Sequence, residues 1–219
     1  IAGTSTGGLA RQTVRVNVRA RRGPGRPAGG KLVVDRELLL DAAERVIARD
    51  GAGASIEAIA AEAGVTKPIV YARVGARAEL CEALAERFTD RLTKSARDRV
   101  KSLEPSRDAL VQLFRATLET IGEHRSLFLF VSRGGDDTAE RTLHVAGRSA
   151  PRLADLHVVW RTALGLDTSS AEPWAYGTLG MLNLVSLWWV ESSDEPAQRL
   201  AERLADLVWP GLASESYRE

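Results

Sequence analysis

Apolar residues recur at the spacing of an α-helix along nearly all of the chain after residue 34. In the first such segment the pattern is i, i+3, i+4, it stops at Asp50 and Gly51, and its members are Leu38, Leu39, Ala42, Ala43, Val46 and Ile47. The same period predicts helices near 55–63, 66–72, 77–101, 106–122, 124–132, 137–165, 171–192 and 195–209. A break or kink is expected at Pro151, because proline lacks an N–H. No set of alternating strands follows residue 35, so we predict an all-α fold.

Two of these helices are short and are separated by a tight turn. In the segment SIEAIAAEAGVTKPIVYARVG (55–75), Ser55 and Thr66 each stand where a side chain can cap a helix. Gly64 gives the turn between them its backbone freedom, and Val65 supplies a small apolar plug. The arrangement predicts a helix-turn-helix, a motif whose second helix enters the major groove of DNA. Other helical hairpins share this spacing, so the motif alone is weak evidence for DNA binding.

Charge is distributed unevenly along the chain. Residues 1–34 hold seven basic residues and no acidic one, whereas 35–82 hold six basic and nine acidic residues. Residues 83–219 hold seventeen basic and twenty acidic residues. A basic arm on a mildly acidic body favours a polyanionic partner such as nucleic acid, although a solvated tail has the same composition.

The arm sequence VRVNVRARRGPGRP (14–27) permits two interpretations. Its first half alternates like a β-strand, with one face formed by Val14, Val16 and Val18. Alternatively the segment is a basic arm that reaches into the minor groove of DNA, with contacts from Arg21, Arg22 and Arg26. The last six residues are similar to an AT-hook core into which a Pro-Gly pair is inserted.

The amphipathic first helix, the helix-turn-helix and the start of a long helix together resemble the TetR family of transcriptional repressors. The resemblance rests on LLLDAAERVIARDG (38–51), SIEAIAAEAGVTK (55–67), Val70-Tyr71 and Gly75 to Leu80, and more loosely on RLAERLADLVWPGL (199–212). Beside the basic arm at 1–34, it implies a DNA-binding domain over 35–82 and a ligand-binding and dimerisation domain over 83–219. It further implies a ligand-responsive repressor that binds a palindromic operator as a homodimer.

The resemblance also assigns the DNA contacts. Contacts with the DNA backbone are implied for Thr66, Lys67, Tyr71, Arg73 and Arg77. Arg77 has the alternative of capping its helix or pairing with Glu79. Ile69 and Ala72 offer only apolar contact, for example with a thymine methyl. The sequence departs from the family where Pro68 replaces a common Gly and Arg73 a common His, so direct base reading by the second helix should be modest.

Residues 83–219 carry two further features. Apolar residues cover much of the last two helices, which predicts a four-helix bundle between two subunits. These apolar residues are Leu179, Leu182, Val185, Trp188, Trp189, Leu200, Leu204, Leu207 and Val208. A pocket for a small, mostly apolar ligand is expected among the middle helices. Its candidate lining residues, each with the alternative of a plain core role, are Phe114, Leu118, His124, Phe128, Phe130, Trp160, Trp174, Tyr176, Met181 and Asn183.

Other chemistries find little support in the sequence. The single Cys81 excludes an internal disulfide, and the three histidines lack metal-ligand spacing, so neither metal nor cofactor is expected. Neither a phosphate-binding glycine loop nor a nucleophile elbow occurs, so we do not expect an enzyme. Short apolar runs and a start without a secretory pattern predict a cytoplasmic protein. An architectural protein that coats A·T-rich DNA, or an all-α enzyme, remains as an alternative.

Overall fold

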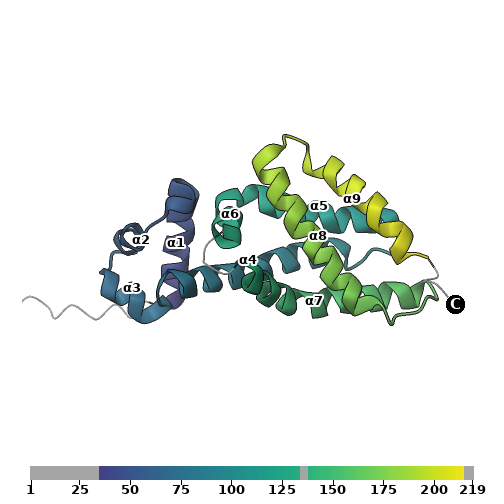
Figure 1. Ribbon diagram of the computed structural model, residues 1–219, viewed down its shortest axis with the longest axis horizontal. Coiled ribbons are helices and arrows are strands. Elements are labelled where there is room, and N and C mark those ends of the chain that lie inside the picture. The colour runs from purple at the N-terminus through teal and green to yellow at the C-terminus, as the bar shows by residue number, and fades with distance from the viewer. Residues whose placement is uncertain (1–34, 134–137, 215–219) are drawn as a thin grey trace, which may run out of the picture. The chain divides into compact units, whose positions relative to one another are not determined.

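The predicted helical periodicity is realised throughout the described part of the chain. The computed structural model describes residues 35–133 and 138–214, and for 138–146 the backbone alone. Its helices are α1 (Arg36–Asp50), the 3-10 helix η1 (Gly51–Gly53), α2 (Ile56–Glu62), α3 (Lys67–Val74), α4 (Arg77–Val100), α5 (Arg107–Glu123), α6 (Arg125–Arg133), α7 (Thr138–Ala163), α8 (Ala171–Ser192) and α9 (Ala197–Leu212). No strand occurs within the two described ranges, so the all-α prediction is confirmed (Figure 1).

Single residues determine where the helices of the helix-turn-helix begin and end. The Ser55 hydroxyl accepts a hydrogen bond from the Ala58 N–H at 3.1 Å and caps α2 as expected. Gly75 ends α3 with φ at 84°, a conformation that side chains rarely adopt. A Cβ atom at Gly75 would also lie 2.7 Å from the Cβ of Glu79. The junction between α3 and α4 therefore requires glycine.

Two expectations that involve prolines are corrected by the structure. Thr66 precedes α3 as expected, but its side chain makes no capping hydrogen bond. Pro68 in the first turn lacks the N–H that a cap would engage, and the Ile69 N–H already donates to the Thr66 carbonyl oxygen. The break expected at Pro151 is absent, because α7 continues through it as one helix. Packing of α7 along α8, with Ala150 fully buried, offsets the backbone hydrogen bond that proline removes.

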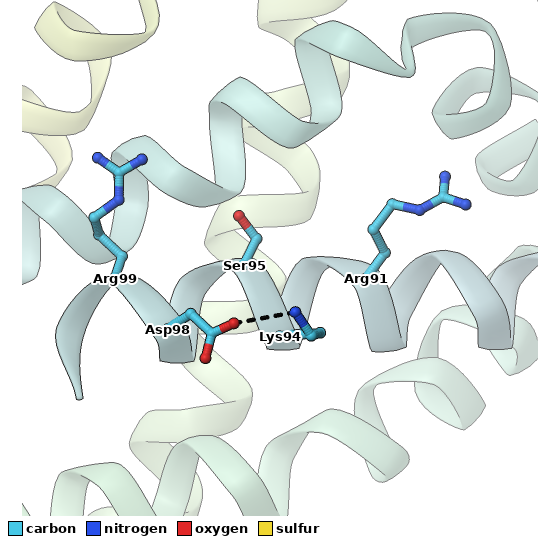
Figure 2. A pocket seen from close by; sticks show the side chains of 5 residues that line it. All are labelled: Arg91, Lys94, Ser95, Asp98 and Arg99. Carbon is cyan, nitrogen blue, oxygen red and sulfur yellow. Dashed lines mark hydrogen bonds and ion pairs between the residues drawn. The ribbon is translucent and has the colours of Figure 1, made fainter.

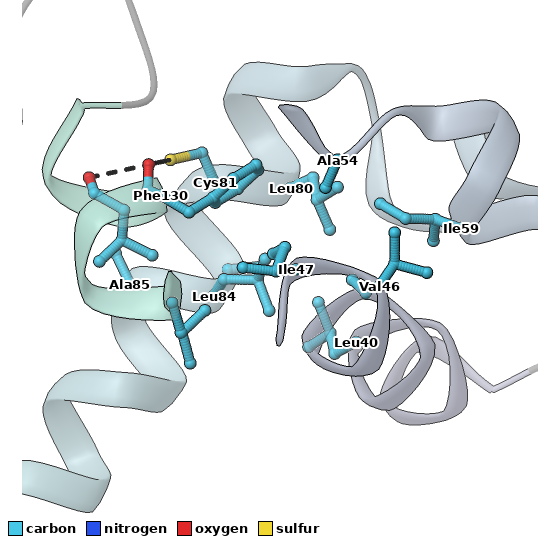
Figure 3. Close-up of a cluster of buried hydrophobic side chains, with 14 of the residues drawn as sticks. Leu40, Val46, Ile47, Ala54, Ile59, Leu80, Cys81, Leu84, Ala85 and Phe130 are labelled. Carbon is cyan, nitrogen blue, oxygen red and sulfur yellow. Dashed lines mark hydrogen bonds between the residues drawn. The ribbon is translucent and has the colours of Figure 1, made fainter. Parts of the chain in front are cut away.

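One apolar core joins the helix-turn-helix to the first half of α4 and to α6. Figure 3 shows this core, with buried side chains from α1, α2, α4 and α6, among them Leu40, Ile47, Ile59, Leu84 and Phe130. Val70 and Val74 of α3 complete it. Since α6 lies about 50 residues further along the chain, its place in this core links the DNA-binding motif to the remainder of the protein.

A second apolar core lies among α5, α9, α8, α7 and the end of α4. It contains Leu110, Phe114 and Leu118 of α5, Trp160 of α7 and Leu204 of α9, among others. α4 runs from the first core into the second without interruption, across the boundary expected between residues 82 and 83 (Figure 1). Among the described helices, none is both long and apolar enough to cross a membrane.

Candidate nucleic-acid interface and ligand cavity

α3 has one face in the core and one face open to solvent. Val70 and Val74, four residues apart on one side of the helix, are buried. Five of the six residues from which the sequence predicted a contact at α3 are exposed, namely Thr66, Ile69, Tyr71, Ala72 and Arg73, and the sixth, Lys67, is half-buried. Tyr71 is 47% exposed, although a tyrosine ring is a common core residue. The open face of α3 is thus available to a partner.

The charged residues at α3 differ in whether they have a hydrogen-bond or ion-pair partner within the protein. Lys67 is paired with the Glu57 carboxylate of α2, which raises the pKa of the lysine and lowers that of the glutamate. The Lys67 side chain is 42% exposed and that of Glu57 is 61% exposed, so solvent screens the pair, which contributes little stability and can be exchanged for a phosphate. Arg73 makes no hydrogen bond or ion pair with a described residue, which leaves its five donors available.

Arg77 is exposed as well, but unlike Arg73 it has partners within the protein. Its Nη1 donates to the carbonyl oxygen of Ala54 at 2.7 Å, and its Nη2 donates to that of Ala52 at 3.0 Å. The guanidinium carbon lies 4.8 Å from the centre of the Phe130 ring in α6. None of these three partners was expected from the sequence, which offered a helix cap or Glu79 as the alternatives to a phosphate. The expected arm contacts, Arg21, Arg22 and Arg26, lie outside the described residues.

A cavity of about 1250 Å³ lies among α4, α5, α6, α7 and α8. Its walls are mostly apolar, with side chains such as Phe88, Leu92, Leu113, Ile121 and Leu182. Three of the residues expected to line a pocket do so, and they are Phe128, Tyr176 and Asn183. The Oδ1 atom of Asn183 is buried and has no hydrogen-bond partner in the described part of the chain, so it can accept one from a ligand.

Seven other candidate residues lie away from this cavity, and that part of the expectation is corrected. Phe114, Leu118 and Trp160 are buried in the second core, where α5 packs against α9. Met181 packs against the same core from α8, and Trp174 lies 4.7 Å from the guanidinium of the buried Arg161. His124 forms a T-shaped pair with Phe88, with ring centres 6.2 Å apart, and so contacts a lining residue without lining the cavity itself. Phe130 faces Arg77 rather than the cavity.

Charged side chains of α4 form one rim of the cavity. Asp90 accepts a hydrogen bond from Arg152 of α7 at 3.0 Å, and both residues line the cavity. Lys94 and Asp98 form a pair at 3.2 Å, which lowers the pKa of the aspartate. The same pair borders a shallow outer groove of about 500 Å³, together with Arg91, Ser95 and Arg99 (Figure 2). A ligand in the cavity would therefore meet apolar walls inside and fixed charges at the rim.

The apolar surfaces of α8 and α9 are divided between the interior and solvent. Leu182, Leu200 and Leu204 are buried within the subunit, so the expectation that they meet a second subunit is wrong. Trp189 is also turned inward, since its Nε1 donates to the Glu195 carbonyl oxygen at 2.7 Å. Three large apolar side chains remain strongly exposed on these two helices, namely Leu184 (71%), Trp188 (50%) and Leu207 (70%).

These features define the class of the protein. A helix-turn-helix with an open second helix, joined through one core to a helical body that holds an apolar cavity, is the architecture of a ligand-responsive DNA-binding regulator. A family described as bacterial regulatory proteins, tetR family, matches residues 39–84. A second, described as tetracyclin repressor-like, C-terminal domain, matches residues 100–219. The chain belongs to the TetR family and is a DNA-binding transcriptional regulator.

Individual relatives agree with this assignment. The HTH-type transcriptional activator FasR of Mycolicibacterium smegmatis is 32% identical over 210 residues, which cover 90% of this chain and 94% of FasR. A TetR-like transcriptional regulator from Rhodococcus sp. RHA1 is 27% identical in sequence, with a TM-score of 0.55 over 82% of this chain and 96% of that one. The fold is also that of the regulator FadR of Bacillus subtilis, solved in complex with stearoyl-CoA, at 16% identity and a TM-score of 0.60 over 83% of this chain and 99% of FadR.

Proposed function

We propose that the protein binds a palindromic operator as a homodimer, through α3 and the basic arm, and that a ligand in the cavity changes its affinity for DNA. The observation that carries the proposal is the open face of α3, where Tyr71 and Arg73 are exposed beside two buried valines. Since DNA is the partner, a cytoplasmic location follows as an expectation. In place of the phosphate contact, we assign Arg77 a structural role.

The open face of α3 combines few base-reading groups with several that suit phosphate. The Tyr71 hydroxyl, the Arg73 guanidinium, the Thr66 hydroxyl and the Lys67 ammonium can each donate to a phosphate oxygen. Ile69 and Ala72 supply apolar contact in the major groove. We therefore expect α3 to fix the position of the protein on the duplex and to supply a small part of the sequence specificity. The arm should supply much of the affinity.

Replacement of the Tyr71 hydroxyl tests this division of roles. Tyr71→Phe keeps the ring and removes one hydrogen bond to a charged group, so DNA binding should weaken by about 1.5 kcal/mol per half-site. A phosphate contact carries no sequence information, so the loss should be equal for operator variants that differ in base sequence. Titration of several such duplexes measures this. A loss confined to one base position would show that Tyr71 reads a base instead.

A ligand with a long apolar part suits the cavity best. The walls are mostly apolar, Asn183 offers one buried acceptor, and the related fold of FadR holds stearoyl-CoA. We expect stearoyl-CoA at about 100 times its dissociation constant to stabilise the folded protein by about 2.7 kcal/mol. This would raise the melting temperature by roughly 5–10 °C for a chain of this size.

A space-filling substitution serves as the test of the cavity. Leu92→Trp enlarges a lining residue and should abolish most of the temperature shift. Leu103→Trp enlarges an exposed residue that does not line the cavity, and should leave the shift as in the wild type. An equal shift in both variants would place the ligand outside the cavity.

The direction of regulation has two candidates. A repressor releases its operator when the ligand favours the state that does not bind DNA, and this is the mode that we propose. An activator is the second candidate, because the relative FasR bears that name at 32% identity over most of this chain. Transcription from a reporter under the selected operator, with and without the regulator, separates the two: expression falls with a repressor and rises with an activator.

A further inference from the structure

Arg77 joins three elements that are far apart in the sequence. It is the first residue of α4, and its two hydrogen bonds hold the carbonyl groups of Ala52 and Ala54 in the segment before α2. Its guanidinium also lies against the Phe130 ring of α6. The side chain thus connects the start of the helix-turn-helix, the start of α4 and the middle of α6.

The position of this arginine is unfavourable unless those contacts are made. A cation in the first turn of a helix faces the positive end of the helix dipole. Two carbonyl oxygens and the face of an aromatic ring compensate for this, and they use the planar fork that distinguishes arginine from lysine. Donors that are committed to Ala52 and Ala54 are not presented to a DNA phosphate.

The contacts of Arg77 lie between the cavity and the DNA-binding motif. Ala54 is buried and directly precedes Ser55, whose hydroxyl caps α2, so the two hydrogen bonds fix where the motif begins. Figure 3 shows Ala54 and Phe130 in the same apolar cluster, where Phe130 is 1% exposed. Three other residues of α6, Phe128, Val131 and Ser132, line the cavity. α6 therefore contributes both to the cavity wall and to the contact with Arg77.

We propose that Arg77 is a positioning residue, which holds the helix-turn-helix against α6 so that the packing of α6 beside the cavity governs DNA affinity. The role rests on the proposed use of α3 as the DNA-binding helix. It gives the cavity a physical connection to that helix through one side chain and the first core.

The test compares Arg77→Lys, Arg77→Met and Phe130→Leu on a duplex that the wild-type protein selects from a random library. A phosphate contact requires only the positive charge, which lysine retains, whereas the positioning role requires the planar guanidinium group of arginine. We expect Arg77→Lys and Arg77→Met to weaken binding by a similar factor, about three- to thirtyfold, with an unchanged dependence on salt. Phe130→Leu should also weaken DNA binding, although Phe130 is almost fully buried. In the double variant of Arg77→Met and Phe130→Leu, the factor by which affinity falls should be smaller than the product of the factors for the two single variants.

Arg73→Met is the matched control, since it removes an arginine without a described partner from the open face of α3. It should reduce the slope of log affinity against log salt by about 0.9 per subunit. The proposal would be overturned by two results together. Arg77→Lys would bind DNA as tightly as the wild type, and Arg77→Met would lower the salt slope of DNA affinity as much as Arg73→Met does. Independent, multiplicative effects of Arg77→Met and Phe130→Leu would overturn it as well.

Two further measurements keep the outcomes distinct. Thermal unfolding shows which variants are folded, and Phe130→Met, which conserves volume better, replaces Phe130→Leu if the latter unfolds. Should Arg73→Met leave both affinity and salt slope unchanged, the DNA face proposed for α3 would be wrong. That outcome can be distinguished from a failure of the Arg77 proposal, because the Arg77 proposal is tested by comparing the DNA affinities of Arg77→Lys and Arg77→Met.

Discussion

Trp188→Ala is expected to convert the proposed homodimer into monomers at nanomolar concentration. Trp188, Leu184 and Leu207 are the large apolar side chains that remain strongly exposed on α8 and α9, and we expect a second subunit to cover them. Truncation of a central interface tryptophan costs about 2 kcal/mol or more, and each residue occurs twice in a two-fold interface. The dissociation constant of the dimer should therefore rise by about a thousandfold. Sedimentation at a series of concentrations measures it.

The loss of the dimer should extend to DNA. A monomer presents one α3 to one half-site, so the affinity gained from binding two linked half-sites is lost. Leu103→Ala is the control, because Leu103 is exposed and apolar but lies outside α8 and α9. A Trp188→Ala protein that stays dimeric and binds the operator as before would move the interface away from these two helices.

Deletion of residues 1–30 should produce the second large effect, a weaker and less salt-dependent affinity for DNA. The deletion removes six arginines from each subunit and no acidic residue. If Arg21, Arg22 and Arg26 of both subunits neutralise phosphates, the slope of log affinity against log salt should fall by about 5. Between about 0.05 and 0.2 M salt, the affinity of the wild type should therefore fall roughly a thousandfold more than that of the deletion variant. Fluorescence anisotropy at four or five salt concentrations gives both quantities.

Glutamine variants of the complete chain distinguish the effect of losing positive charge from the effect of removing the segment. A triple variant with glutamine at Arg21, Arg22 and Arg26 should reproduce most of the change in slope. The matched triple variant at Arg11, Arg15 and Arg19 removes the same charge further from α1 and should change the slope less. Equal slopes for the wild type and the first triple variant would remove the arm from the DNA interface.

Local features of this fold were predictable because they depend on neighbours in the sequence. The serine cap at Ser55 and the glycine stop at Gly75 are properties of a few consecutive residues, and the structure has both. The inward side of α3 was predictable as well, since valines four residues apart must share a face. Two local predictions fail, and both involve a proline: the Thr66 cap is missing beside Pro68, and α7 continues through Pro151.

Features that depend on long-range contacts were not predictable. Phe88 and Phe114 both lie on apolar stripes, but only Phe88 lines the cavity, because that depends on which helix packs opposite. α8 is apolar around much of its circumference, so periodicity could not distinguish the buried Leu182 from the exposed Leu184. The partners of Arg77 lie 23 and 25 residues earlier in the chain and 53 residues later, beyond any local pattern.

Selection of duplexes from a random library by the wild-type protein, followed by footprinting of the winners, tests the central claim most directly. A dimeric regulator should select a discrete site with two inverted half-sites, whose centres lie about one DNA turn (~34–36 Å) or more apart. The footprint should cover both half-sites with two subunits bound. Uniform protection of any A·T-rich duplex would indicate an architectural protein instead, and absence of binding at low salt would contradict the account altogether.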